Sequence, residues 1–162
     1  MFRLSKITDY GIVLLARLAR DTEATTHNAR ELAAEVDLPA PVVSKILKLL
    51  AREGVLESRR GAKGGYALVR RPEDVTVAEM IRILEGPVAL TECSVAPSSC
   101  EHETNCAVRE PWQIISGVVA EALSTITLAD LNDRSFRQIL LPLQIERSQV
   151  EAVGKITEGP QA

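Results

Sequence analysis

The stretch PVVSKILKLLAREGVLESRRGAKGGYALVR, residues 41–70, joins an amphipathic segment to two short apolar runs that flank a glycine-rich turn. Its first half carries apolar side chains at helical spacing, namely Val43, Ile46, Leu47 and Leu50. This spacing predicts a helix over 41–53 that begins with a proline and is stopped by Gly54. VLESRR and YALVR are typical of the two strands of a hairpin, with GAKGG as the turn between them.

Other helices are predicted on both sides of this stretch. Each begins at a side chain that can accept a hydrogen bond from an unpaired backbone N–H: Ser5, Asn28 with Glu31, and Thr76 with Glu79. Three short helices and a two-stranded hairpin describe a winged helix-turn-helix domain over residues 1–86. The predicted fold class is therefore mostly α with a small β-hairpin wing.

A long helical stretch follows at about residues 110–126. Its apolar residues advance in steps of three and four along the chain, at Trp112, Ile115, Val119, Ala122 and Ile126. Such a stripe is typical of a seam between two helices, so we predict a dimerisation helix and a homodimer. The segment TLADL extends this region to 131 as a capped turn. Residues 132–162 show no persistent period and are expected to form a flexible tail.

Charge is unevenly distributed along the chain. Residues 40–71 carry eight Lys and Arg side chains and two Glu, a net charge of +6 in a protein whose net charge is −3. A basic segment in an acidic protein indicates a local surface for a polyanion, although a solvated charged face would look the same.

The basic segment coincides with the predicted second helix of the helix-turn-helix and with the wing, which favours double-stranded operator DNA as the partner. Helix-turn-helix units that serve only as interaction modules are the alternative. We expect Ser44 and Lys45 to reach base edges, and Lys48 and Arg52 to meet phosphates. The candidate DNA-binding residues of the wing, where arginine can enter the minor groove, are Arg59, Arg60 and Lys63.

Composition excludes several classes of protein. No apolar run approaches the length of a membrane span, and the N-terminus has no signal-peptide pattern, so we expect a cytoplasmic protein without a membrane partner. The chain has only two histidines and no nucleotide-binding loop, and an enzyme is not expected. Three cysteines, an odd number, argue against a disulfide framework.

The three cysteines, Cys93, Cys100 and Cys106, are gathered in TECSVAPSSCEHETNCAVREPW, residues 91–112. They fall in a loop predicted over residues 87–109, between the DNA-binding domain and the dimerisation helix. Thiolates are soft ligands for zinc, copper(I) or iron–sulfur clusters. Spacings of six and five residues are wider than those of most structural zinc sites and suit a loop around a larger inorganic core. An iron–sulfur cluster, a zinc ion and a cluster-free redox thiol sensor all stay open at this point.

Taken together, several segments resemble the IscR/NsrR family of dimeric winged-helix regulators. They run from Leu4 to about Leu131: LSKITDYG, RRGAKGGYAL, VAEMIRILEGP, the cysteine loop, Trp112 and ITLADL. TDYGIVLL, LPAPVVSKILKLLAREG and EGPVALTECS look most like the regulator of the Suf iron–sulfur assembly operon. The resemblance implies a transcriptional regulator, most similar to a repressor, that senses iron–sulfur clusters; a nitric-oxide-sensing repressor of the same family is the alternative.

The resemblance also implies a set of ligands for a 2Fe-2S or 4Fe-4S cluster: the three cysteines and one further residue. The histidine that one branch carries three residues after the last cysteine is replaced here by Arg109, which stays protonated and cannot ligate a metal. The other branch uses an aspartate in the first helix of the partner subunit, and Asp9 matches it. His102, inside the loop, is the second candidate. Ser44 stands where the IscR branch commonly carries a glutamate, so a different operator is expected.

Overall fold

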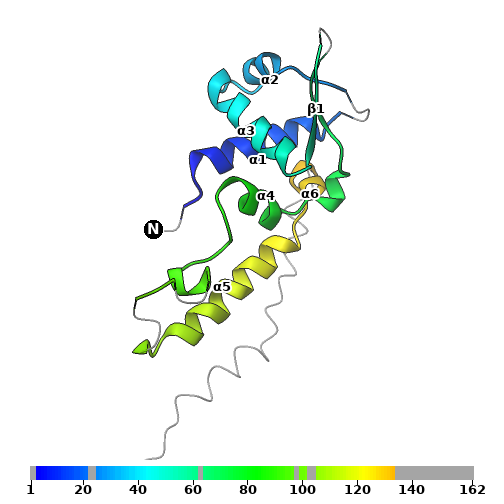
Figure 1. Cartoon of the computed structure of the whole chain (residues 1–162). Helices are drawn as coiled ribbons and strands as arrows, with labels where there is room; N and C mark the ends of the chain where they lie inside the picture. Colours follow the sequence, from blue (N-terminus) through cyan, green and yellow to red (C-terminus); the bar gives the residue numbers. More distant parts are fainter. Residues whose placement is uncertain (1–2, 22–24, 62–63, 97–98, 102–104, 134–162) are drawn as a thin grey trace, which may run out of the picture. The chain divides into compact units, whose positions relative to one another are not determined.

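The computed structural model describes residues 3–21, 25–61, 64–96, 99–101 and 105–133. The residues up to Asn132 belong to one compact unit, which contains all the helices and strands described below (Figure 1). The flexible tail predicted for 132–162 lies almost entirely outside the described residues.

The first three helices form at the predicted positions. They are α1 (Lys6–Leu18), α2 (Ala29–Glu35) and α3 (Ala40–Arg52). The Ser5 hydroxyl accepts a hydrogen bond from the backbone N–H of Thr8 at 3.3 Å, and the Asn28 side chain accepts from Arg30 and Glu31 at 2.9 and 3.0 Å. These side chains satisfy donors that the first turn of a helix leaves unpaired, as the sequence predicted.

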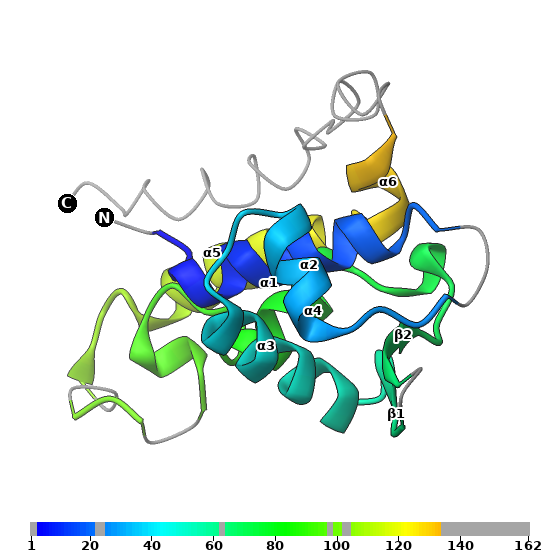
Figure 2. The same ribbon diagram turned by 90° about the horizontal axis from the view of Figure 1, so that it is seen from above.

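The wing is an antiparallel pair of strands, β1 (Leu56–Arg59) and β2 (Gly65–Leu68), which follows α3 directly (Figure 2). Its return strand is joined to the segment before α2, because His27 and Tyr66 exchange two backbone hydrogen bonds of 2.9 and 2.8 Å. Gly65 allows this approach, since a Cβ atom there would lie only 2.2 Å from the carbonyl oxygen of His27. The wing is therefore fixed to the helical part of the domain near the start of β2, close to the turn.

The side chain of His27 strengthens this junction. Its Nε2 lies 2.6 Å from a carboxylate oxygen of Asp21, which also accepts a hydrogen bond from Arg17 at 3.0 Å. Burial would raise the pKa of the Asp21 carboxyl, but the hydrogen bonds from Arg17 and His27 hold that pKa below its usual value. The carboxylate therefore stays charged between its two partners at neutral pH.

α4 (Val77–Leu84) begins at Thr76, whose hydroxyl accepts from the backbone N–H of Glu79 at 3.2 Å, and is followed by Gly86 at φ +112°. In the predicted capping pattern the Glu79 carboxylate would also accept a hydrogen bond from the backbone N–H of Thr76, and this part of the prediction is wrong. The Glu79 carboxylate accepts instead from the Arg70 guanidinium at 2.7 Å. Arg70, which follows the wing, therefore binds the Glu79 carboxylate that the capping pattern had predicted to bind the start of α4.

α5 (Arg109–Ser124) and α6 (Leu128–Asn132) complete the unit, with short 3-10 turns at Pro72–Asp74 (η1) and Glu92–Ser94 (η2). After α5 the chain returns to the wing exit. The backbone N–H of Val77 donates to the carbonyl of Ile126, and that of Leu128 donates to the carbonyl of Val75, both at 2.8 Å. Ile126 thus lies beyond the end of α5 and packs against the core, so its predicted place in the dimer seam is wrong.

The core is aliphatic, as the low aromatic content predicts. It is built from fully buried side chains of α1, α3, α4 and α6, among them Leu14, Leu15, Ile46, Leu47, Leu50, Met80 and Leu128. α3 contributes four of its side chains to this core, at the four positions that the helical spacing indicated. Because one face of α3 is committed to the core, its opposite face is presented outward.

Candidate functional site

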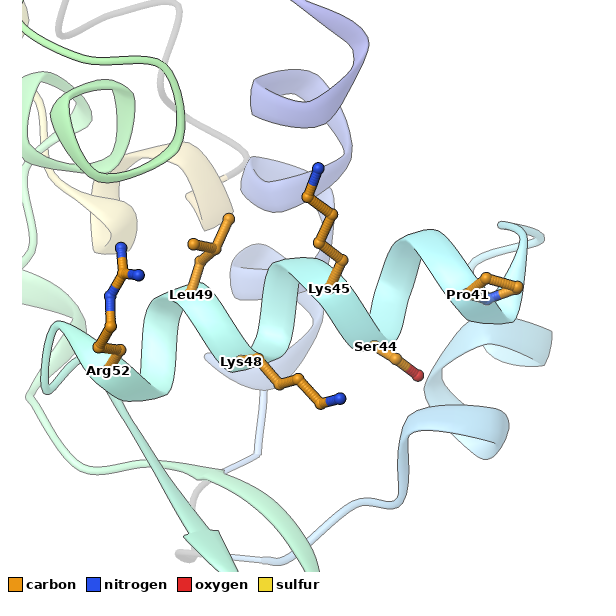
Figure 3. A pocket seen from close by; sticks show the side chains of 6 residues that line it. All are labelled: Pro41, Ser44, Lys45, Lys48, Leu49 and Arg52. Atoms are coloured by element: carbon orange, nitrogen blue, oxygen red, sulfur yellow. The ribbon is translucent and has the colours of Figure 1, made fainter.

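The outward face of α3 carries a shallow hollow. It is lined by six side chains, Pro41, Ser44, Lys45, Lys48, Leu49 and Arg52 (Figure 3). In that view Lys45 and Lys48 extend from the helix on opposite sides of its axis, with Ser44 near the helix start. Four of the predicted DNA-binding residues are therefore brought together on one helix face.

The cations of this face have few acidic neighbours. Within the described part of the chain, no hydrogen bond or ion pair engages the side chain of Lys45 or Lys48. Arg52 lies 3.4 Å from the adjacent Glu53, and its side chain is 71% exposed. An exposed pair of this kind contributes little stability. The three cations are therefore available to an anionic ligand.

The wing adds further positive charge next to α3. The Arg59 guanidinium donates to the Glu57 carboxylate at 3.1 Å, and this hydrogen bond raises the pKa of Arg59. Both side chains of the pair are about half exposed, so a phosphate can compete for the arginine. Arg60 is exposed on the same strand end, whereas the predicted contact Lys63 lies outside the described residues.

The cysteine segment connects α4 to α5. Cys93 lies in η2 and is only 8% exposed, while Cys100 and Cys106 are partly exposed. All three are free thiols. Asp9 is exposed in the first turn of α1, and His102 lies outside the described residues.

Whether these residues can hold a metal ion or cluster depends on which ligand side chains lie close together. Among the described residues, no group of three or more His, Cys, Asp or Glu side chains is close enough to hold a metal ion. The structure thus does not bring the three cysteines together with Asp9. Free thiols on one short segment fit a thiolate-ligated group by their chemistry, and ligation requires the segment to close.

Cys93 is held by contacts that sequence reasoning missed. The side-chain amide of Gln113, on α5, donates to the carbonyl of Cys93 at 3.0 Å. The buried hydroxyl of Ser116, one helical turn along, accepts from the backbone N–H of Leu90 at 3.2 Å. The Thr91 hydroxyl lies 3.2 Å from the Cys93 sulfur. The sequence signal that could have indicated these contacts was weak. It consists of two polar residues, Gln113 and Ser116, that lie three positions apart and outside the apolar seam of the helix.

The other side of α5 is apolar and uncovered. Trp112, Ile114, Ile115 and Val118 are each between 40 and 51% exposed. Two of them, Ile114 and Val118, lie outside the predicted seam, so the uncovered face is broader than the sequence indicated. Among the described residues, no helix is both long and apolar enough to span a membrane.

Comparison with known proteins gives consistent matches. The model of the Rrf2 family, described as an iron-dependent transcriptional regulator, matches residues 4–134. CymR of Bacillus subtilis, an HTH-type transcriptional regulator, is 30% identical over 122 residues, which span 75% of this chain and 83% of CymR. NsrR of Geobacillus kaustophilus, another HTH-type transcriptional regulator, is 29% identical over 141 residues, or 86% of this chain and 96% of NsrR.

Solved structures agree with these matches. The structure of CymR, the global cysteine regulator of B. subtilis, superimposes with a TM-score of 0.64 and covers 82% of this chain and 97% of that one. IscR of T. potens superimposes with a TM-score of 0.62 over 99% of this chain and 94% of that one, at 22% identity. At that identity the second match supports the fold alone. The predicted winged-helix fold is confirmed.

Proposed function

The chain belongs to the Rrf2 family of transcriptional regulators, and from that premise we propose that it is a homodimeric, iron–sulfur-sensing repressor of a Suf-type assembly operon. Its relatives are regulators rather than enzymes, as the sequence predicted. Its partner is double-stranded operator DNA in the cytoplasm, bound by the outward face of α3 and by the wing.

The observation that carries the DNA part of the proposal is the face of α3 (Figure 3). A helix with this exposed, basic face matches what the major groove accommodates. In this proposal Ser44 and Lys45 contact base edges, and Lys48 and Arg52 contact phosphates. Arg59, Arg60 and Lys63 of the wing are the proposed contacts with the neighbouring groove.

The sensing part of the proposal rests on the cysteine segment. Cys93, Cys100 and Cys106 would hold the cluster, and Asp9 of the first helix is the proposed fourth ligand, contributed by the second copy of the chain. When bound, such a cluster supplies a chemistry that responds to iron, oxygen and nitric oxide. The protein's own contribution is a segment that joins α4 of the DNA-binding domain to α5, so that closure of the segment can alter both.

The homodimer is supported by the uncovered apolar face of α5. A contiguous stripe of half-exposed Ile, Val and Trp side chains is costly in water and is stabilised when a second copy covers it. A two-fold dimer also places two recognition helices on one duplex, which is how helix-turn-helix proteins read paired half-sites.

DNA binding can be tested by measuring affinity for the protein's own upstream DNA and for unrelated DNA over a range of salt concentrations. Lys48→Ala should weaken both about equally and lower the salt slope by about one, because one phosphate contact is lost. Lys45→Ala should weaken binding to the upstream DNA more than to unrelated DNA. Arg20→Ala, at an exposed arginine just after α1, is the control. Affinity unchanged in both lysine variants would place the DNA surface elsewhere.

Three other functions share parts of this evidence. A nitric-oxide-sensing repressor would use the same residues, and the NsrR relatives favour it. A zinc-bound or cluster-free thiol sensor is favoured by the two partly exposed thiols, Cys100 and Cys106. Metal analysis of protein purified without oxygen separates them: iron with sulfide supports a cluster, one zinc per chain supports the zinc module, and no metal supports the thiol sensor. Rates of reaction with nitric oxide then separate the two cluster sensors.

A further inference from the structure

We propose that Gln113 and Ser116 of α5 are positioning residues that hold Cys93 in place before any ligand binds, so that Cys93 is the fixed thiol of the segment and Cys100 and Cys106 are the accessible ones. The proposal rests on the proposed function, in that it treats the cysteine segment as the sensing site. It assigns the three thiols unequal roles, which the spacing of the cysteines alone does not suggest.

Two hydrogen bonds fasten the first part of the segment to α5. The Gln113 amide donates to the Cys93 carbonyl, and the Ser116 hydroxyl accepts from the Leu90 N–H. Residues three apart lie next to each other on a helix surface, so the two side chains form one row on α5. They bond to the backbone of the segment, not to its side chains, and therefore fix the path of the chain on both sides of Thr91.

The fastened part is also the buried part. Ser116 is 4% exposed and Cys93 is 8% exposed, whereas Cys100 and Cys106 are partly exposed. The turn η2 adds local order, because the backbone N–H of Ser94 donates to the Thr91 carbonyl at 3.0 Å. The Thr91 hydroxyl bonds to the hydroxyl of Ser94 at 2.9 Å and lies 3.2 Å from the Cys93 sulfur. Cys93 is therefore restrained by η2 and by α5 at the same time.

The last cysteine has a different attachment. Cys106 lies near the start of α5, and its carbonyl accepts a hydrogen bond from the backbone N–H of Arg109 at 3.3 Å. This bond is local in sequence and is made by main-chain atoms alone. Among the described residues, no hydrogen bond joins Cys106 to a second helix or strand. Because a thiol must be exposed to react with a bulky reagent, the more restrained Cys93 thiol should react more slowly than the Cys106 thiol.

Single-thiol proteins can measure this difference in the absence of metal. The chain has three cysteines, so the double variant Cys100→Ser with Cys106→Ser leaves Cys93 as the only thiol. The two other pairwise combinations isolate Cys100 and Cys106. We expect the aromatic disulfide DTNB to react most slowly with Cys93.

Removing the anchors should then expose Cys93. In the Cys93-only protein, Gln113→Ala is expected to raise the rate of reaction about fivefold, the factor that corresponds to one intramolecular hydrogen bond. Gln113→Glu should raise it similarly, because a carboxylate of nearly the same shape cannot donate to the Cys93 carbonyl. A role in packing alone would leave the glutamate variant unchanged. Ser116→Ala is expected to act in the same direction.

Matched controls come from the same helix. Ser124→Ala removes a hydroxyl that donates to the carbonyl of Ala120 in its own helix and has no other hydrogen bond within the described part of the chain. It should leave the Cys93 rate unchanged. Circular dichroism and thermal melting identify any variant that loses its fold. If Gln113→Ala does so, the reaction rate of Gln113→Glu, which changes the shape of the side chain less, is compared with that of the parent protein.

Two results would overturn the inference: a Cys93 that reacts as fast as the other two thiols, or a rate in the Gln113 variants equal to that of the parent protein. Both are measured in metal-free protein, so they do not depend on the cluster. A chain that never binds iron but protects Cys93 through Gln113 would refute the proposed sensing function and leave this inference standing.

Discussion

Thr8 is a polar side chain with no exposed surface, and its hydroxyl donates to the carboxylate of Glu85 at 2.7 Å. The same carboxylate accepts from the backbone N–H of Ser5 at 3.2 Å. A negative charge at the start of α1 also interacts favourably with the helix dipole. Glu85 therefore caps α1 from the end of α4, which is the point where the cysteine segment begins.

This contact predicts a stability effect. Thr8→Val keeps the shape of the side chain but removes the donor, and should lower the free energy of unfolding by about 1 kcal/mol. Urea denaturation at fixed protein concentration measures it. Thr25→Val, at an exposed position, is the control and should change little. Equal stability of Thr8→Val and the parent would show that the buried hydroxyl finds another partner or that the Glu85 contact contributes nothing.

Single residues also show where sequence reasoning stops. Ser5 and Asn28 cap their helices as predicted, because a capping side chain bonds within three residues of itself. Glu79 does not follow its pattern, since a guanidinium from another element competes for the carboxylate. Gln113 was not predicted at all: its partner lies twenty positions away, and no local pattern records such a distance.

Among the elements, α5 carries the proposed dimer interface. Its uncovered face includes Val118, whose side chain is 45% exposed in the single chain. If a second copy covers this face, a charge there must lose its water on association, which is strongly unfavourable. Val118→Glu should therefore convert the dimer to monomer at micromolar concentration, as seen by sedimentation or light scattering.

Val69→Glu provides the matched control, because Val69 is also an exposed valine, 52% exposed, but follows β2 of the wing. It should leave the dimer intact. A Val118→Glu protein that stays dimeric would move the interface to another surface.

At this scale the sequence predicted most of the fold. Helical spacing located α3 and α4, and glycines located the turns, because these signals depend on near neighbours. Periodicity also found α5 but extended its apolar seam to Ile126. That residue is partly buried against the core, where backbone bonds return the chain to Val75 and Val77. A pattern of apolar residues cannot distinguish contact with the chain's own core from contact with a second copy.

For the whole molecule, the proposed coupling between the cysteine segment and DNA depends on Asp9. Asp9→Ala should still allow iron to bind through the three thiols, but the DNA affinity of the iron-loaded protein should move toward that of the metal-free protein. The reason is that the tie between the segment and the first helix of the second copy would be lost. Titration of operator DNA with both forms measures the difference.

His102→Ala serves as the comparison for this prediction and should leave the two affinities as they are in the parent. The opposite pattern, with His102→Ala damaging iron binding and Asp9→Ala silent, would place the fourth ligand within the segment.

The return of the chain after α5 has a consequence for how such proteins diverge. The chain that follows α5 is bound to the residues just before and at the start of α4 by the hydrogen bonds of Val77 with Ile126 and of Leu128 with Val75. A residue inserted or deleted between Val95 and Arg109 lies outside both sets of anchors, the bonds of Leu90 and Cys93 to α5 and those of Val75 and Val77 to the chain after α5, so it need not move α6 out of the core. Mutations that change the length of this segment leave the DNA-binding domain intact. Evolution can therefore vary the spacing of the cysteines, and with it the signal that they sense, one residue at a time.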